Sequence, residues 1–433
     1  MIDPTPALDP EQLIELALKA GAEAAEVFQS CALSRPVFFE ANRLKQLESA
    51  QVEGTALRLW MHGRPGLAVA HGPVDSHALI DRAIGLSHLN NPEDRDLAKQ
   101  LNHHYPDLGE AVSGEQLVRW GENSIDQIRQ QYPDTLCLAE WECESETTRL
   151  VNSTGLDCSY TDITLSAYLA ADWIRGDDFL NVADGQVQRN HLNPQLLVDQ
   201  ILQRLAWAEE RAPVTNGRVP VLFTAKAADM LWGTLQSALN GKQVAEKASP
   251  WSDRLGDRVT HPSITLYQQP DVGPFSCPFD DEGNPTRPIT FIEGGTLKLF
   301  YTDTTTGKTL GSGSTGNGFR PSLSSYPSPG LFNLLVNPGQ KPLSELIRNL
   351  DEGLIVDQIL GGGAGISGEF SINVDLGFWI HKGQVVGRVK DTMVAGNVYT
   401  ALRQLIALGN DAAWNGSCYT PSVVLEGLST VGR

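Results

Sequence analysis

Positive charge is scarce in this sequence. Its 433 residues include 33 Lys and Arg against 52 Asp and Glu, which gives a formal net charge of −19. Proteins that wrap a nucleic-acid backbone need clustered basic residues, and anionic membrane surfaces attract the same residues. The charge balance therefore argues against nucleic acid and membrane as partners. No apolar run approaches the roughly 18 residues that a membrane-spanning helix needs.

Cysteine and histidine are sparse and scattered. The six cysteines are Cys31, Cys137, Cys143, Cys158, Cys277 and Cys418, and they form no C-x-x-C pair. This usage is typical of a reduced cytosolic protein. The start at Met1 lacks a basic segment followed by an apolar one, so we expect no signal peptide and a cytoplasmic location. The nine histidines contain no pair at the spacing of H-E-x-x-H, which zinc hydrolases use.

Strand patterns dominate what the sequence does contain. Short apolar runs separated by tight turns predict strands through 25–70, and further strands over 135–143 and 148–152. Helices are expected at about 10–20, 75–89, 114–131, 193–211, 226–240 and 395–408. Runs of strands with a few separated helices indicate an α+β fold rather than a parallel α/β fold.

A proline-bounded linker at Pro213–Pro220 divides the chain. We expect an N-terminal α+β part at 1–212, which the polar stretch 90–113 can divide into subdomains at about 1–90 and 114–212. A β-rich C-terminal domain with a few helices is expected at 217–433.

Two Gly-rich stretches match G-x-G-x-x-G, at Gly311–Gly316 and Gly363–Gly368. A dinucleotide site needs such glycines between a strand and a helix, whereas a strand pattern follows Gly368. Two interpretations remain, namely tight turns between strands, or exposed backbone that receives an extended peptide as an added strand. The acidic stretch Phe279–Thr286 lacks EF-hand spacing, and Gly283 within it favours a polar hairpin turn.

A serine or cysteine nucleophile stays open at this point, because catalytic triads assemble in space. There is no G-x-S-x-G elbow. Ser312 and Ser314 lie in a Gly-rich loop, and Cys418 lies in a loop near the C-terminus. No basic partner is near Cys418 in the sequence, which favours an inert thiol.

An ordered set of segments runs through most of the chain. The second half contains Phe279–Thr286, Phe291–Lys298, Gly311–Gly318, Gly368–Ser371 and Val389–Asn397, and the first half contains Asn42–Leu47, Gly54–Arg58 and Val151–Gly155. In this order and spacing they resemble the TldD/PmbA family. The resemblance implies a two-part α+β chain in a cytosolic bacterial setting.

The resemblance also implies a division of labour between two kinds of subunit. The TldD-type subunit is a zinc metallopeptidase with an HExxxH helix and a further cysteine ligand near its C-terminus. The PmbA/TldE-type partner lacks the motif, and the pair encloses a chamber in which unfolded peptide is cut. Here Trp232, Gly233 and Ser237 stand where His, Glu and His would, and Cys418 matches the cysteine. An indole, a bare backbone and a hydroxyl supply neither ligands nor a base.

The chain therefore resembles the PmbA/TldE-type subunit, with no catalytic or metal-binding residue of its own and zinc expected in the partner. Its partner is expected to be a TldD-type subunit or a second copy, and its ligand an unfolded peptide. The expected peptide contacts are Ser314, Thr315, Gly316, Asn317, Arg320, Gly363, Gly365 and Gly368. Their backbone groups would make most of the contacts, and Arg320 would hold a peptide carboxylate or carbonyl. The alternatives are a free-standing peptide hydrolase using Cys418 or a loop serine, and a homodimeric peptide-binding protein.

Overall fold

The computed structural model describes residues 9–94, 96–99 and 102–432. Its first part is built on an 8-stranded sheet in the order β4-β3-β1-β6-β7-β5, with β2 beside β1 and β8 beside β7. The elements are α1 (Pro10–Lys19), β1 (Ala24–Glu40), β2 (Arg43–Leu47), β3 (Ala50–Met61), β4 (Arg64–His71), α2 (Ser76–Ser87), β5 (Asn102–His104), α3 (Gly114–Gln131), β6 (Thr135–Asn152), β7 (Asp157–Arg175), β8 (Asp178–Gln188) and α4 (Pro194–Trp207).

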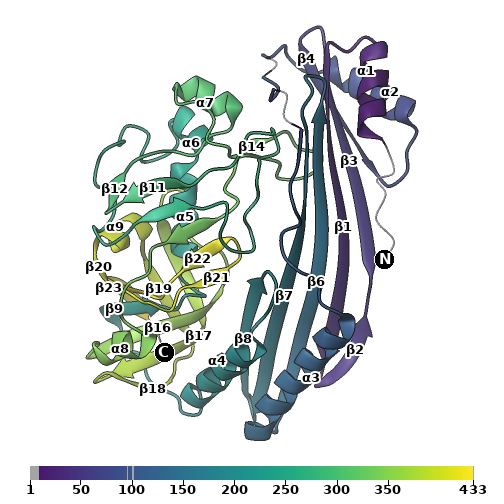
Figure 1. The fold of residues 1–433 in the computed structure, drawn as a ribbon. Coiled ribbons are helices and arrows are strands. Elements are labelled where there is room, and N and C mark those ends of the chain that lie inside the picture. Colours follow the sequence, from purple (N-terminus) through teal and green to yellow (C-terminus); the bar gives the residue numbers. More distant parts are fainter. Residues whose placement is uncertain (1–8, 95, 100–101, 433) are drawn as a thin grey trace.

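The central strands of this sheet are long, and Figure 1 shows β1, β6 and β7 running its whole height. We expected two strands in the β6 region, but β6 continues without a break through residues 144–147. Its polar residues there are held on both sides, because Glu144 pairs with Ser34 of β1 and with Thr164 of β7. Continuous pairing on both edges therefore overrides the weak local strand preference of these residues.

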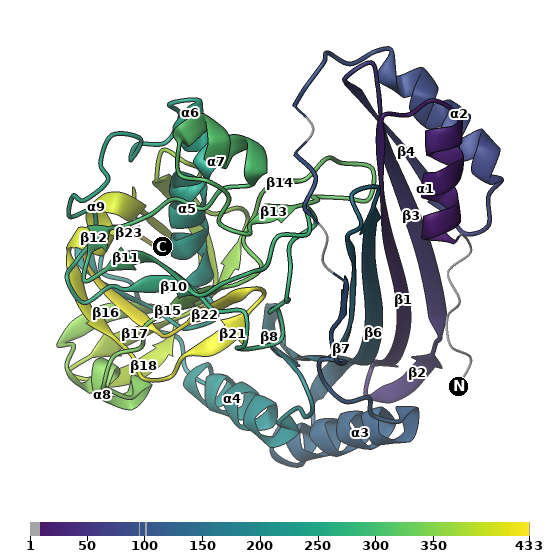
Figure 2. The same ribbon diagram turned by 45° about the horizontal axis from the view of Figure 1, so that its top comes forward.

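Helices cover the sheet at its two ends (Figures 1 and 2). At one end α1 and α2 bury Leu13, Ile80 and their neighbours against β1, β3 and β4. At the other end α3 and α4 pack over Trp141 of β6. Among the residues that the structure describes, no helix is long and apolar enough to cross a membrane.

The second part contains a 7-stranded sheet, β16-β9-β23-β19-β17-β18 with β20 beside β23, a 6-stranded sheet, β12-β11-β10-β15-β22-β21, and the pair β13-β14. The elements are β9 (Gly217–Phe223), α5 (Asp229–Leu239), α6 (Gly241–Ala245), β10 (Leu266–Gln268), β11 (Ile289–Glu293), β12 (Thr296–Leu297), α7 (Thr304–Leu310), β13 (Gly318–Phe319), β14 (Ser328–Pro329), β15 (Leu334–Val336), α8 (Leu343–Arg348), β16 (Glu352–Leu360), β17 (Glu369–His381), β18 (Gln384–Arg388), β19 (Thr392–Asn397), α9 (Val398–Arg403), β20 (Leu405–Leu408), β21 (Ala413–Asn415), β22 (Cys418–Thr420) and β23 (Val423–Val431). The many strands and separate helices confirm the α+β class.

The expected helix over 395–408 was mostly wrong. The segment begins in β19, forms the single short helix α9, and returns as β20. Both flanking strands pair with β23, since Ala395 lies opposite Ser429 and Leu408 opposite Val423. Sheet pairing with a distant strand thus outweighs the helical preference of the sequence, as tertiary context often does.

The acidic stretch forms the expected hairpin, with Phe279 and Pro285 bridged across the turn. It is buried rather than exposed, because it lies between the two parts. Phe279 is 2% exposed and packs edge-on against Tyr160 of β7. The carboxylate of Asp280 accepts backbone N–H groups within the turn and from Gly318.

Buried ion pairs join the two parts at both ends of their contact. Glu26 of β1 lies 3.0 Å from Arg320, with both side chains under 5% exposed. Asp178 at the start of β8 lies 3.4 Å from Arg388 of β18. A shared hydrophobic cluster includes Trp141 and Phe378, so the parts also pack against each other through a continuous core.

Candidate functional site

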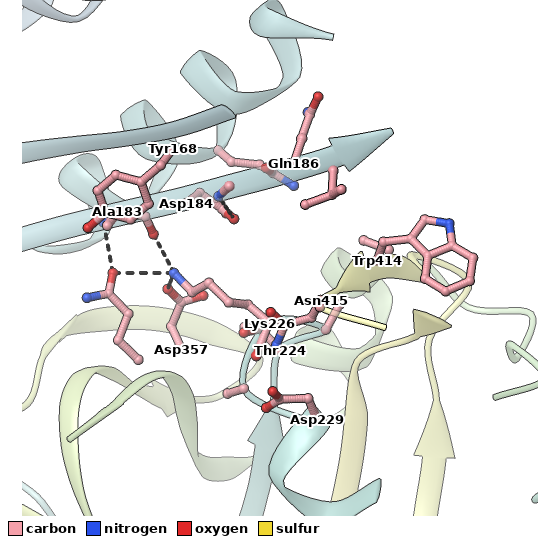
Figure 3. Close-up of a pocket in the computed structure, with 18 of the residues that line it drawn as sticks. Tyr168, Ala183, Asp184, Gln186, Thr224, Lys226, Asp229, Asp357, Trp414 and Asn415 are labelled. Atoms are coloured by element: carbon pink, nitrogen blue, oxygen red, sulfur yellow. Dashed lines mark hydrogen bonds and ion pairs between the residues drawn. The ribbon is translucent and has the colours of Figure 1, made fainter. Parts of the chain in front are cut away.

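A cleft of about 1600 Å³ lies between the two parts. Figure 3 shows its two walls. Tyr168 and Gln186 line it from strands β7 and β8 of the first part. Lys226 follows β9 and Asp357 belongs to β16, so these two line it from the second part, while Trp414 of β21 stands at one end.

A chain of buried charges crosses the cleft from one wall to the other. Arg204 of α4 lies 3.0 Å from Asp184 of β8 and 2.8 Å from Asp357. The other oxygen of Asp357 lies 2.8 Å from the Lys226 ammonium, which also donates to the carbonyl of Ala183 at 2.6 Å. Burial alone would raise the pKa of Asp357, but the charges of Arg204 and Lys226 outweigh burial and lower it to about 2. These charges therefore hold the two walls together, and each charged group lies within 3.0 Å of a group of opposite charge.

Helix α5 forms part of the cleft and contains the three positions that the resemblance aligns with the zinc motif. Trp232 is fully buried, and its indole N–H donates to Thr420 at 2.6 Å. Gly233 lines the cleft, and a Cβ added there would meet nothing within 4 Å. The hydroxyl of Ser237 donates to the carbonyl of Gly233 at 3.1 Å, within the helix. Of these three, only Gly233 faces the cleft, and it has no side chain.

Cys418 does not lie in the loop that the sequence suggested, because it is the first residue of β22, beside α5, and is 5% exposed. Burial raises the pKa of its thiol, and the charge of nearby Asp229 raises it further. A thiolate is the reactive form of cysteine, so this environment argues against Cys418 as a nucleophile. In the described part of the chain, no three His, Cys, Asp or Glu residues are grouped so that they could hold a metal ion.

The two predicted peptide-contact loops lie in different surroundings. Gly363 lines the cleft, and a second cavity of about 340 Å³ on the other side of Gly233 is lined by Ile366 of the same loop. A Cβ added at Gly365 would meet nothing within 4 Å. Gly368 has a φ of +80°, and a Cβ there would meet the ring of Tyr399. The loop 363–368 is therefore brought next to α5.

The segment 314–320 lies instead at the junction of the two parts. Thr315 and Asn317 are buried and hydrogen-bonded to each other, and Arg320 donates to Glu26. Gly316 has a φ of +74°, and its backbone N–H is bonded to the Ser314 hydroxyl. The polar side chains of Thr315, Asn317 and Arg320 are thus engaged inside the protein, and peptide contact by this segment stays a prediction.

Sequence reasoning missed four polar residues that line the cleft, namely Thr224, Lys226, Asp229 and Asp357. A signal for them exists. The first three follow directly after the apolar strand β9, and Asp357 interrupts the apolar run of β16. Polar residues at the end of, or inside, a buried strand are uncommon without a function or a partner.

The comparisons with known proteins point to one family. A family model described as PmbA/TldA metallopeptidase C-terminal domain matches residues 216–432. A Metalloprotease PmbA homolog from Haemophilus influenzae is 27% identical over 224 residues, 51% of this chain and 47% of its own length. A Metalloprotease TldD homolog from Buchnera aphidicola (subspecies Acyrthosiphon pisum) is 31% identical over 42% of this chain and 38% of its own length. The chain spans about half the length of the curated relatives it matches.

Solved structures match over nearly the whole chain. The crystal structure of TldE from Thermococcus kodakarensis has a TM-score of 0.90 and 25% identity, covering 98% of this chain and 99% of that one. A protein from Thermotoga maritima, described as a putative modulator of a DNA gyrase, has a TM-score of 0.86 at 21% identity and covers 97% of this chain and 99% of that one, which shows the fold alone. From the family model and these likenesses together, this chain belongs to the PmbA/TldD family.

Proposed function

We propose that this chain is the PmbA/TldE-type, non-zinc partner of a TldD-type metallopeptidase. The pair would act in the cytoplasm and cleave unfolded peptides inside an enclosed chamber. One observation carries the proposal: Gly233, the one position aligned with the zinc motif that lines the cleft, is a bare glycine, where a metallopeptidase helix needs a ligand or a base. The overall likeness to TldE agrees with it.

The residues around α5 do not fit a catalytic zinc ion. Such an ion takes three protein ligands from His, Asp, Glu or Cys and keeps one position for water. Trp232 is committed to Thr420, and Ser237 to a backbone carbonyl. Asp229 lies near Cys418, but a carboxylate and a thiol are two potential ligands, one fewer than a catalytic zinc ion needs. No catalytic step is therefore assigned to this chain.

The task left to this chain is to hold substrate and close the chamber. Two edge strands, β8 and β21, line the cleft. An extended peptide can add to such an edge through backbone hydrogen bonds, which depend little on its sequence. Gly363 lies on the same cleft and leaves room for a passing backbone.

Co-purification with the TldD-type subunit of the same organism tests the proposal. Each subunit would be assayed for zinc by mass spectrometry, and each subunit and the mixture for hydrolysis of an unfolded peptide. We expect a stable heteromer, zinc in the TldD-type subunit and cleavage only by the mixture. Stoichiometric zinc in this chain would refute the proposal. Cleavage by this chain alone in a chelator would favour a free-standing hydrolase, and a self-dimer that ignores the TldD-type subunit would favour a homodimeric binding protein.

A further inference from the structure

The residues that line the cleft include more acidic side chains than basic ones. Its lining includes two basic residues, Arg204 and Lys226, and the six acidic residues Glu140, Asp184, Asp229, Asp357, Asp375 and Asp411. Both basic residues are used by Asp184 and Asp357. Within the described ranges, the other four carboxylates have no ion pair. A cleft of this composition favours positively charged ligands and repels acidic ones.

Asp229 is the one of these four carboxylates that belongs to helix α5. It is the first residue of α5 and is half-buried on the floor of the cleft, below Lys226 in Figure 3. Burial raises its pKa, and the neighbouring backbone N–H of Met230 offsets this only in part. Lys226 does not neutralise it, because its ammonium is held by Asp357 and Ala183. Even partial burial of a carboxylate without a cation is unfavourable, and a cationic ligand would offset that cost.

A second, independent observation lies next to it. Thr224 begins the turn from β9 toward α5, lines the same cleft and is 3% exposed, yet its hydroxyl has no hydrogen-bond partner among the residues that the structure describes. Buried hydroxyl groups are nearly always satisfied, so one without a partner in a cleft wall indicates a ligand that supplies it. One turn beyond Asp229, the missing side chain of Gly233 leaves open space.

We infer that Asp229 and Thr224 form a subsite for the cationic nitrogen group of a peptide lying in the cleft. The group is an ammonium or guanidinium, which donates to the carboxylate of Asp229 and to the hydroxyl of Thr224. Its source is a Lys or Arg side chain or the free N-terminus of the peptide. The inference rests on the proposed peptide function and adds to it a preference for basic peptides.

Peptide binding measured by fluorescence anisotropy tests the subsite. The probe is a labelled, unstructured 12-residue peptide with one central Lys, compared with the same peptide carrying norleucine there, each with a free or an acetylated N-terminus. The full-length chain would be used alone and in complex with the TldD-type subunit. A charge-assisted hydrogen bond predicts that the cationic peptide binds about tenfold more tightly. Loss of the gain with norleucine identifies a side chain as the source, and loss on acetylation identifies the N-terminus.

The matched variants are Asp229→Asn and Asp375→Asn. Asp375 lines the same cleft but is exposed, so its variant removes an equal charge away from the subsite. We expect the preference for the cationic peptide to vanish in Asp229→Asn and to persist in Asp375→Asn. Thr224→Val, which keeps the shape and removes the hydroxyl, should reduce the preference severalfold and serves if Asp229→Asn does not fold.

The failures are distinguishable. If all peptides bind and the preference is absent, or is the same in Asp229→Asn and Thr224→Val as in the unmodified chain, the subsite is overturned while peptide binding stands. If no peptide binds the chain alone or in the complex, the subsite and the proposed function fall together.

Discussion

Replacing Asp357 by Asn tests whether the buried charge chain holds the two parts together. Asp357 has no exposed surface, and its two oxygens each lie 2.8 Å from a cation, Arg204 and Lys226. The lowering of its pKa from 3.8 to about 2 corresponds to about 2.4 kcal/mol, at roughly 1.36 kcal/mol per pKa unit. The variant loses this contribution and leaves the buried Arg204 and the half-buried Lys226 each short of a partner, so we expect the free energy of unfolding to fall by about 3–5 kcal/mol.

Urea denaturation followed by tryptophan fluorescence measures this loss at pH 7. Asp375→Asn serves as a control, because Asp375 is exposed and, among the described residues, accepts a single hydrogen bond, from Gln358 at 3.3 Å. Its effect should stay within about 0.5 kcal/mol. Because the folded-state pKa of Asp357 is lowered, its contribution is complete above pH 3.8 and is lost as the pH falls through about 2. The difference between wild type and Asp357→Asn should therefore be constant down to about pH 4 and narrow below it. Equal stability at pH 7 would refute the reasoning.

Three further predictions concern stability. Gly66→Ala should destabilise the chain strongly, since a Cβ would lie 2.0 Å from a backbone oxygen of α2. Gly233→Ala should stabilise it by about 0.5–1 kcal/mol, because the position is inside a helix and the added Cβ would meet nothing within 4 Å. Thermal melts of the two variants measure both effects. Thr420→Val removes the acceptor of the buried Trp232 indole and should cost about 1–3 kcal/mol in urea denaturation. Burial raises the pKa of Asp281 to about 6, so the folded state binds a proton on this carboxyl more tightly than the unfolded state does. The protonated carboxyl therefore contributes about 3 kcal/mol to stability at low pH, and this contribution should be lost as the pH rises from 3.8 to 6. Unfolding midpoints measured across this range should lose that slope in Asp281→Asn.

Local sequence patterns predicted those helices whose structure depends mainly on residues close together in the sequence. The helix expected at about 10–20 is α1, and Asp9 caps it, because its side chain accepts the N–H groups of Glu11 and Gln12. The helix expected at 226–240 is α5, which spans Asp229–Leu239 and is followed by the short helix α6 from Gly241. Where pairing with a distant strand decides, as between residues 395 and 408, the same kind of reasoning failed.

The cleft could not be predicted in this way, because its chemistry comes from pairs far apart in the chain. The Arg204 and Asp357 side chains that cross it are 153 residues apart. Each taken alone looks like an ordinary charged residue in a strand or helix. Only their contact in the folded chain shows that these two charges offset each other.

Gly233 links the absence of zinc ligands to the proposed binding role. Neither packing nor backbone conformation requires glycine there, because the residue is helical and a Cβ would meet nothing within 4 Å. Glycine in a helix interior costs about 0.5–1 kcal/mol relative to alanine, so the fold gains nothing from it. What Gly233 does provide is room in the cleft, one turn beyond an unpaired Asp229. Helix α5 thus presents a carboxylate and an open space to the cleft, an arrangement consistent with the proposed role of holding a peptide.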